Sequence, residues 1–243
     1  MRTRFGWSFI TTLIMENVAK AYDLRFVVNI SELGEGDPLM QNVTRLSTLL
    51  NVPWYTTGVS EREDLDCFLQ QIKLPHGRIL DIVSLNIALL QDTMLVGSSN
   101  GMRDNLLNWL TRTLEATTSS WRIVVGFHSL VAREENDKQL IAEQIHEPLH
   151  HIFVKLGVNV YLSQQGCYSY ALQDSVAYIG NPGLTEANSH LASANGRFLV
   201  RKEMINGFLL RRLSLLEMVT YLVTLAGSVV NKVVVQQRGR EVM

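Results

Sequence analysis

The sequence predicts a layered α/β fold in a single domain, and two observations lead to this prediction. Strand-like apolar segments alternate with segments whose apolar residues recur at helical spacing, which is typical of sheets covered by helices. The chain of 243 residues, 47% of them hydrophobic, can bury one sizeable core, and only five prolines interrupt it. Because we find no internal repeat, low-complexity tract or linker, we expect one domain over residues 1–243, with a frayed tail at 237–243.

The first two thirds of the chain contain the alternating helices and strands. Apolar residues at helical spacing predict a helix over 9–22, and the run LRFVVNI predicts a buried strand at 24–30. Further along we expect a polar turn at 32–38, a helix through 43–50, a strand at 52–55, a strand or strand pair over 81–95, a loop at 97–101, an amphipathic helix at 102–116, a strand at 121–126, a helix at 137–156 and a strand at 158–163.

The last third of the chain has a different pattern. Short apolar runs predict strands at 176–179, 207–213, 216–224 and 228–236. The pair Ala226-Gly227 between the last two runs matches a tight hairpin connection. This region is therefore expected to consist of consecutive strands joined by turns.

Charge and composition exclude some classes of function. The 22 basic and 23 acidic residues leave a formal net charge of −1, so the chain has no overall positive charge for binding a nucleic-acid backbone. No apolar run is long enough for a transmembrane helix, and we recognise no signal peptide or targeting segment, so localisation is unassigned. Cys67 and Cys167 allow at most one internal disulfide and cannot form a structural zinc site by themselves.

Several segments, taken in order, resemble a known family. They are FVVNI at 26–30, NVPWY at 51–55, LLQDT at 89–93, NLLNWLTRTL at 105–114, WRIVVGFH at 121–128, GVNVYLS at 157–163 and the strand-rich stretch 207–230. Together they span nearly the whole chain and resemble the calcineurin-like metallophosphoesterases, of the plant purple acid phosphatase type. The resemblance implies an α/β/β/α sandwich of two facing mixed sheets with outer helices, in which the family's first strand is missing from this chain.

The resemblance also implies a site for two metal ions that activate water for attack on a phosphate ester. The positions that match the family's metal ligands hold Glu32, Glu35, Phe127, Gln165 and Cys167. Glu32 falls on the bridging aspartate and Glu35 on the metal-binding tyrosine. With a short insertion Asp37 matches the bridging position instead. Residues 56–62 contain neither the asparagine nor the histidine of the family motif.

These replacements predict a protein without a metal site. Phenylalanine binds no metal, and an amide is a poor ligand for iron or zinc compared with imidazole. We therefore expect no cofactor, no catalytic residue and an inactive metallophosphoesterase-like protein that binds a protein or a phosphorylated small molecule. The alternative is a divergent acid phosphatase whose reduced iron, zinc or manganese site uses Glu32, Asp37 or His128, with Cys167 as a further candidate.

Three other patterns have simpler interpretations. The sequence from His146 to His150 matches the zinc-protease motif, but Pro148 interrupts it, so we expect a solvated, histidine-rich helix face. Residues 97–101 match the serine-hydrolase elbow and are interpreted as a glycine-serine turn. The pairs Arg211-Arg212 and Arg201-Lys202 predict a solvated sheet edge, with binding of an anionic ligand as the alternative.

Overall fold

The structure is a computed structural model, and it confirms a mixed α/β chain with several sheets and few helices. It describes residues 2–31, 33–43, 51–57, 67–86, 100–130, 141–164, 168–180, 193–194, 197–198, 200–201 and 207–237. No helix in this part of the chain has the length and apolar character needed to cross a bilayer.

A seven-stranded mixed sheet forms the centre of the fold, in the order β11-β7-β8-β6-β5-β4-β3. Neighbouring strands in the run β4-β5-β6-β8 are parallel, whereas β3, β7 and β11 are antiparallel to their neighbours. Its strands are β3 (Phe68–Lys73), β4 (Ile79–Leu85), β5 (Trp121–Gly126), β6 (Val160–Ser163), β7 (Tyr168–Gln173), β8 (Val176–Gly180) and β11 (Val200–Arg201).

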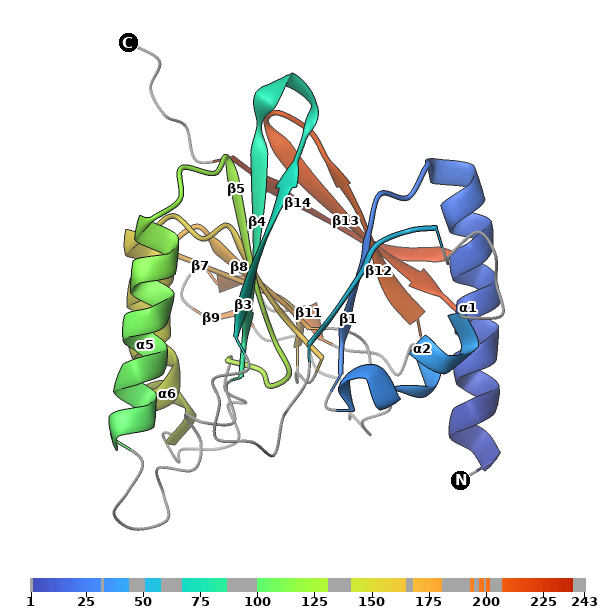
Figure 1. The fold of residues 1–243 in the computed structure, drawn as a ribbon, viewed down its shortest axis with the longest axis horizontal. Coiled ribbons are helices and arrows are strands. Elements are labelled where there is room, and N and C mark those ends of the chain that lie inside the picture. Colours follow the sequence, from blue (N-terminus) through green and yellow to red (C-terminus); the bar gives the residue numbers. More distant parts are fainter. Residues whose placement is uncertain are drawn as a thin grey trace.

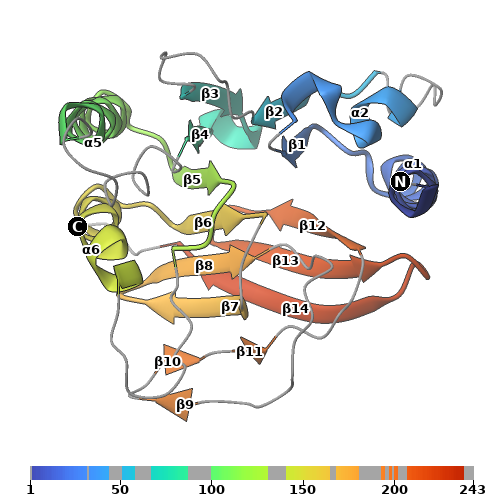
Figure 2. The ribbon, with the colours of Figure 1, turned by 90° about the horizontal axis from the view of Figure 1, so that it is seen from below.

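Both faces of this sheet are covered. On one face, α5 (Asn100–Glu115) and α6 (Ile141–Lys155) contribute Leu110 and Phe153 to a core that also contains Val124. On the other face lies an antiparallel three-stranded sheet of β12 (Gly207–Leu213), β13 (Glu217–Thr224) and β14 (Val229–Gln236) (Figures 1 and 2). Because β5 is buried on both faces, its sequence is apolar on both faces apart from Arg122, rather than alternating.

The amino-terminal elements form a smaller group beside the two sheets. Here β1 (Val27–Ile30) and β2 (Trp54–Thr57) form a parallel pair. The helix α1 (Arg2–Tyr22) packs Met15 and Ala19 against Val43 of α2 (Pro38–Val43). The remaining short elements are the 3₁₀ turns η1 (Gly34–Gly36) and η2 (Pro75–Gly77) and the antiparallel pair β9 (Ser193–Ala194) and β10 (Arg197–Phe198).

Most of the predicted elements are present, with four corrections. The helix predicted at 43–50 is wrong in its bounds, since α2 starts at Pro38, a residue suited to a first helical turn, and 44–50 lie outside the described residues. The loop predicted at 97–101 overlaps the start of α5. The strand predicted at 81–95 begins earlier, as β4, and 87–99 are not described. Strands β3 and β7 were not predicted.

The sheet arrangement also differs from the prediction of two mixed sheets. Only the seven-stranded sheet is mixed, because the strands β12, β13 and β14 are joined by tight turns and must run antiparallel. The hairpin at Ala226-Gly227 is confirmed: Gly227 has φ 78° and donates its N–H to the carbonyl of Thr224. Gln237, the first residue of the predicted tail, is hydrogen-bonded to Leu216, and 238–243 lie outside the described residues.

Candidate functional site

The carboxyl ends of β1, β4, β5 and β6 lie at one edge of the molecule, the lower edge in Figure 1. In open α/β sheets, ligands bind outside the carboxyl ends of the parallel strands. We call this region the carboxyl edge. Its described residues are Ser31, Thr57, Asn86, Phe127, His128 and Gln164.

Hydrogen bonds hold the backbone of the carboxyl edge in place. The N–H of Ser31 donates to Oγ1 of Thr57 over 3.0 Å, which joins the ends of β1 and β2. The hydroxyl of Tyr161 donates to the carbonyl of His128 over 2.7 Å. Asn86 is 7% exposed, and its buried Oδ1 accepts no hydrogen bond. At this edge Oδ1 of Asn86 is therefore an amide oxygen without a donor, next to backbone that is held by hydrogen bonds.

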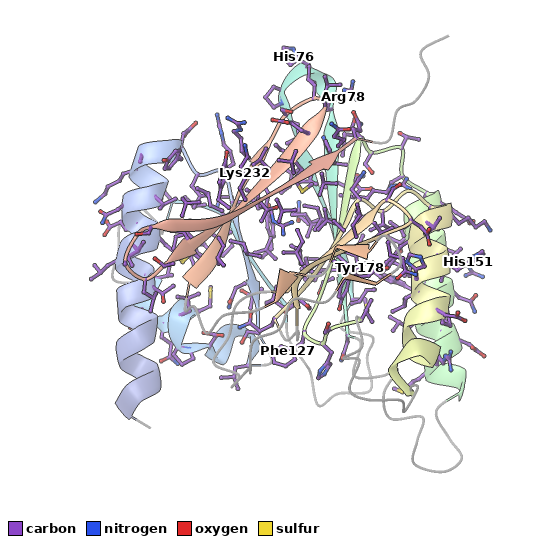
Figure 3. All side chains as sticks on the ribbon, turned by 180° about the vertical axis from the view of Figure 1, so that it is seen from behind. His76, Arg78, Phe127, His151, Tyr178 and Lys232 are labelled. Atoms are coloured by element: carbon purple, nitrogen blue, oxygen red, sulfur yellow. The ribbon has the colours of Figure 1, made fainter. Side chains whose placement is uncertain are left out.

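The structure brings two of the predicted site residues together at this edge. Phe127 and His128 follow β5, and their rings lie edge to face with centroids 5.1 Å apart; Figure 3 labels Phe127 there. Asp37 has a different role, because its Oδ1 accepts the N–H of Leu39 over 2.7 Å at the start of α2. This is the contact of a helix-capping carboxylate. The carboxylate of Asp37 therefore helps to form α2.

For the other predicted ligand positions the structure describes no side chain. The backbone of Glu35 lies in η1, whereas Glu32, Gln165 and Cys167 fall outside the described residues. Within the described part of the chain, no group of three histidine, cysteine, aspartate or glutamate side chains could hold a metal ion.

A cluster around His150 was not predicted from the sequence. Its Nε2 lies 2.8 Å from Oδ2 of Asp174, and its Nδ1 lies 2.7 Å from the hydroxyl of Tyr178. Since a carboxylate only accepts, we assign the ring proton to Nε2, so that Nδ1 accepts from Tyr178. Burial, and secondly the charge of Asp174, raises the pKa of Tyr178 well above its ordinary value. The cluster therefore links α6 to the β7–β8 hairpin.

The predicted solvated histidine face is therefore wrong for His150, which is 9% exposed. The helix α6 continues through Pro148 and turns His150 toward the sheet, while the neighbouring His151 is exposed (Figure 3). Asp174 reaches His150 because Asp174 and Ser175 have φ values of 45° and 67° and form the tight turn between β7 and β8. An Asp-Ser pair between two strand-like runs was the signal available in the sequence.

The predicted solvated edge at Arg211-Arg212 is correct for only one of the two arginines. Arg212 is exposed, and its Nη2 lies 3.4 Å from Oε1 of Glu217. Arg211 lies on the face that carries Leu213, toward the core between the sheets. Burial lowers the pKa of Arg211 to about 9. Its Nη2 is buried and has no hydrogen-bond partner, and neither has the hydroxyl of Thr220 directly opposite on β13.

The three-stranded sheet ends in an apolar edge strand. In the described part of the chain β14 pairs only with β13, so one side of its backbone faces no strand. The eight residues of β14, VVNKVVVQ, carry a single charge, at Lys232. Val229 is 58% exposed and Val234 is 42% exposed. A long, apolar strand edge of this kind is a template for pairing with another chain.

Comparisons with known proteins find a similar fold but no matching family model. No family model matches the chain, and no curated protein matches it. Among solved structures, the chain is similar to one described as GAP50, the anchor in the inner membrane complex of Plasmodium, with a TM-score of 0.70. The two chains are 13% identical, and the match covers 97% of this chain and 85% of that chain. At this identity the likeness shows the fold alone.

These findings overturn the resemblance to calcineurin-like metallophosphoesterases of the purple acid phosphatase type. A solved structure that shares the fold is described as the anchor in the inner membrane complex of Plasmodium, and no family model matches. The resemblance depended on buried strands and amphipathic helices, whose apolar patterns many layered α/β proteins share. What the comparisons support is a mixed α/β fold that is also found in a protein described as an anchor.

Proposed function

We propose that this protein acts by binding a protein partner, and that an extended segment of the partner adds to β14 as a further strand. One observation carries the proposal: β14 is an eight-residue edge strand with exposed valines at Val229 and Val234. Strand addition supplies affinity through main-chain hydrogen bonds and specificity through alternate side chains. A binding function needs no catalytic group.

The chemistry of β14 defines the segment that fits it. Lys232 and Val234 alternate with Val233, which is partly buried, and Val235, which is buried, so Lys232 and Val234 share the outer face of the sheet. A matching segment has a β-branched or aromatic residue opposite Val234 and an acidic residue near Lys232. The segment is therefore extended, largely apolar and mildly acidic.

Two further points support the proposal. One protein with a similar fold is described as the anchor in an inner membrane complex. We also infer that the layers run helix, sheet, sheet, helix, with α5 and α6 on one side and α1 on the other. Among the described strands, β14 is the outer strand of its sheet and pairs with β13 alone. A phosphorylated small-molecule partner, which the sequence also predicted, stays a prediction.

The test compares the full chain with the variant Val234→Asp and the control Leu172→Asp. Leu172 is 37% exposed and lies on β7 of the other sheet, so both variants place a carboxylate on an exposed strand position. We expect at least about tenfold less capture of a specific partner by Val234→Asp, and unchanged capture by Leu172→Asp. Hydrogen exchange should then show β14 amides protected by the captured partner. Equal capture by both variants, or protection elsewhere, contradicts the proposal.

A further inference from the structure

Two hairpin ends lie side by side at the edge opposite the carboxyl edge, at the top of Figure 1. The β12–β13 connection contains Leu215 and Leu216, and the β3–β4 connection contains η2. Leu216 accepts the N–H of Gln237 over 2.7 Å, and Nε2 of Gln237 donates to the carbonyl of Ser120 over 2.9 Å. Arg78 then donates from Nη1 to Oγ of Ser120 over 3.4 Å. This chain of hydrogen bonds joins the two hairpin ends into one surface.

The apolar part of this surface consists of two adjacent leucines. Leu216 is 74% exposed and Leu215 is 44% exposed. The turn that presents them is ordered, because Oγ of Ser214 accepts the N–H of Leu216 over 3.3 Å and that of Glu217 over 3.0 Å. The indole N–H of Trp121 also donates to the carbonyl of Ser214 over 3.1 Å. Both leucines are therefore held outward on a turn that is attached to the core.

The polar part of the surface is basic. Lys73 and His76 are exposed on the β3–β4 hairpin, Arg78 lies beside them, and Arg212 lies at the end of β12. His76 and Gly77 have φ values of 60° and 71°, which gives a sharp turn that projects from the molecule (Figure 3). In the two described segments 73–78 and 212–217, Glu217 is the single acidic residue, and its Oε1 lies 3.4 Å from Nη2 of Arg212. We call this set, with Leu215 and Leu216, the tip surface.

We propose that the tip surface binds an anionic lipid surface. The leucines enter the boundary between headgroups and acyl chains, while the basic side chains contact lipid phosphates and carboxylates. Charge complementarity favours an anionic partner, because Lys73, Arg78 and Arg212 outnumber the one acidic residue of this surface, Glu217. Both leucines project from the β12–β13 turn, which suits a soft surface that they can penetrate. The inference is independent of partner binding at β14.

The test uses the full chain and vesicles of phosphatidylcholine, alone or with about 30 mol % phosphatidylserine, in a flotation assay. We expect binding to the anionic vesicles only, and loss of binding at high salt because screening weakens the basic contacts. The double variant Leu215→Ser with Leu216→Ser should bind about tenfold more weakly. The control Leu172→Ser, which replaces an exposed leucine on β7, should bind like the wild type.

Three outcomes overturn the proposal. They are equal binding to neutral and anionic vesicles, unchanged binding by the double leucine variant, and binding of an acidic peptide without binding of vesicles. The last outcome would indicate a protein partner for the tip surface. Unchanged unfolding temperature checks that the double variant is folded. Val234→Asp should bind anionic vesicles as the wild type does. Failure of the β14 proposal and failure of the tip-surface proposal can therefore be told apart.

Discussion

The two main sheets differ in whether their buried charged groups are hydrogen-bonded. In the seven-stranded sheet, Asp81 is fully buried and accepts hydrogen bonds from Nε2 of Gln71 at 3.0 Å and Oγ of Ser119 at 2.5 Å. Its Oδ2 also lies 3.9 Å from Nε of Arg122. In the three-stranded sheet, Nη2 of Arg211 is buried without a partner. A satisfied polar network stabilises a core, whereas an unpaired buried group costs stability.

The network in the larger sheet also connects elements. Arg122 donates to the carbonyls of Leu156, after α6, and Thr117, after α5, so one guanidinium ties β5 to the ends of both covering helices. The three-stranded sheet has no such network among its described residues, and it carries the exposed valines of β14 and the leucines of the tip surface. The difference indicates that the network of the larger sheet stabilises the fold. The smaller sheet carries β14 and the leucines of the tip surface, and the β3–β4 hairpin of the larger sheet adds the basic residues Lys73 and Arg78.

The largest effect should come from breaking the satisfied network. Replacing Asp81→Ala removes the acceptor of Gln71 and Ser119 and the carboxylate that lies 3.9 Å from Nε of Arg122. We expect a loss of about 4 kcal/mol in the free energy of unfolding, measured by urea denaturation. Asp104→Ala, on the exposed side of α5, is the control and should change stability by less than about 0.5 kcal/mol. A loss for Asp81→Ala as small as the control's would show that the network contributes little.

The next effect tests how tightly the smaller sheet is built. A Cβ added at Gly207 would lie 2.0 Å from the carbonyl oxygen of Val223 on the paired strand, so the backbone would have to move. We expect Gly207→Ala to cost about 3 kcal/mol, by the same urea measurement. A Cβ at Gly101, in the first turn of α5, meets nothing within 4 Å, so Gly101→Ala should be neutral or slightly stabilising. Equal stability of the two variants would contradict the close approach of β12 and β13.

Sequence patterns predicted the strands that are buried on both faces of the sheet, but not the strands that mix polar and apolar residues. WRIVVG, in β5, is apolar except for Arg122 because both faces are buried, and the run IVVG itself identifies the strand. FLQQIK, in β3, and YSYALQ, in β7, mix polar and apolar residues, and their neighbours in the sheet decide their conformation. Only the tertiary structure reveals that Gln71 of β3 donates a hydrogen bond to Asp81 of β4.

The polar clusters could not be predicted from the sequence for a related reason. Ser119 and Asp81 are 38 positions apart, and His150 and Asp174 are 24 apart, so no local spacing links them. The motif around His146 and His150 suggested an exposed face because Pro148 was expected to disrupt the helix. The helix continues instead, and this decides which side of α6 His150 occupies.

A smaller effect concerns the cluster that joins α6 to the larger sheet. Tyr178→Phe removes the hydroxyl that donates to Nδ1 of His150 and leaves that buried nitrogen unpaired. We expect a loss of about 2 kcal/mol near neutral pH. Tyr22→Phe, at a residue that is 69% exposed, is the control and should have no measurable effect.

This prediction has a defined dependence on pH. Burial raises the pKa of Tyr178, so above about pH 10 the unfolded chain releases a proton that the folded chain keeps. Unfolding of the wild type is then favoured as pH rises, and Tyr178→Phe lacks this contribution. The stability difference between the wild type and Tyr178→Phe should therefore shrink above pH 10, as measured by urea denaturation at several pH values. A difference that stays constant would contradict the burial of the hydroxyl.

The smallest effect has the opposite sign and tests the cost of the unpaired charge. Arg211→Met keeps much of the side-chain volume and removes a buried guanidinium whose Nη2 has no partner. We expect a gain of about 1 kcal/mol in the free energy of unfolding. Arg212→Met, the exposed neighbour that pairs with Glu217, is the control and should change stability by less than about 0.5 kcal/mol.

The pH dependence again follows from the direction of the shift. Burial lowers the pKa of Arg211 to about 9, so above that pH the folded chain releases a proton that the unfolded chain keeps. Because the unfolded chain then binds more protons, wild-type stability rises relative to Arg211→Met, and the two proteins should converge as pH increases. If Arg211→Met instead destabilises the protein at neutral pH, the contacts of the Arg211 side chain, such as that of Nη1 with Sδ of Met218 at 3.9 Å, outweigh the cost of its unpaired Nη2.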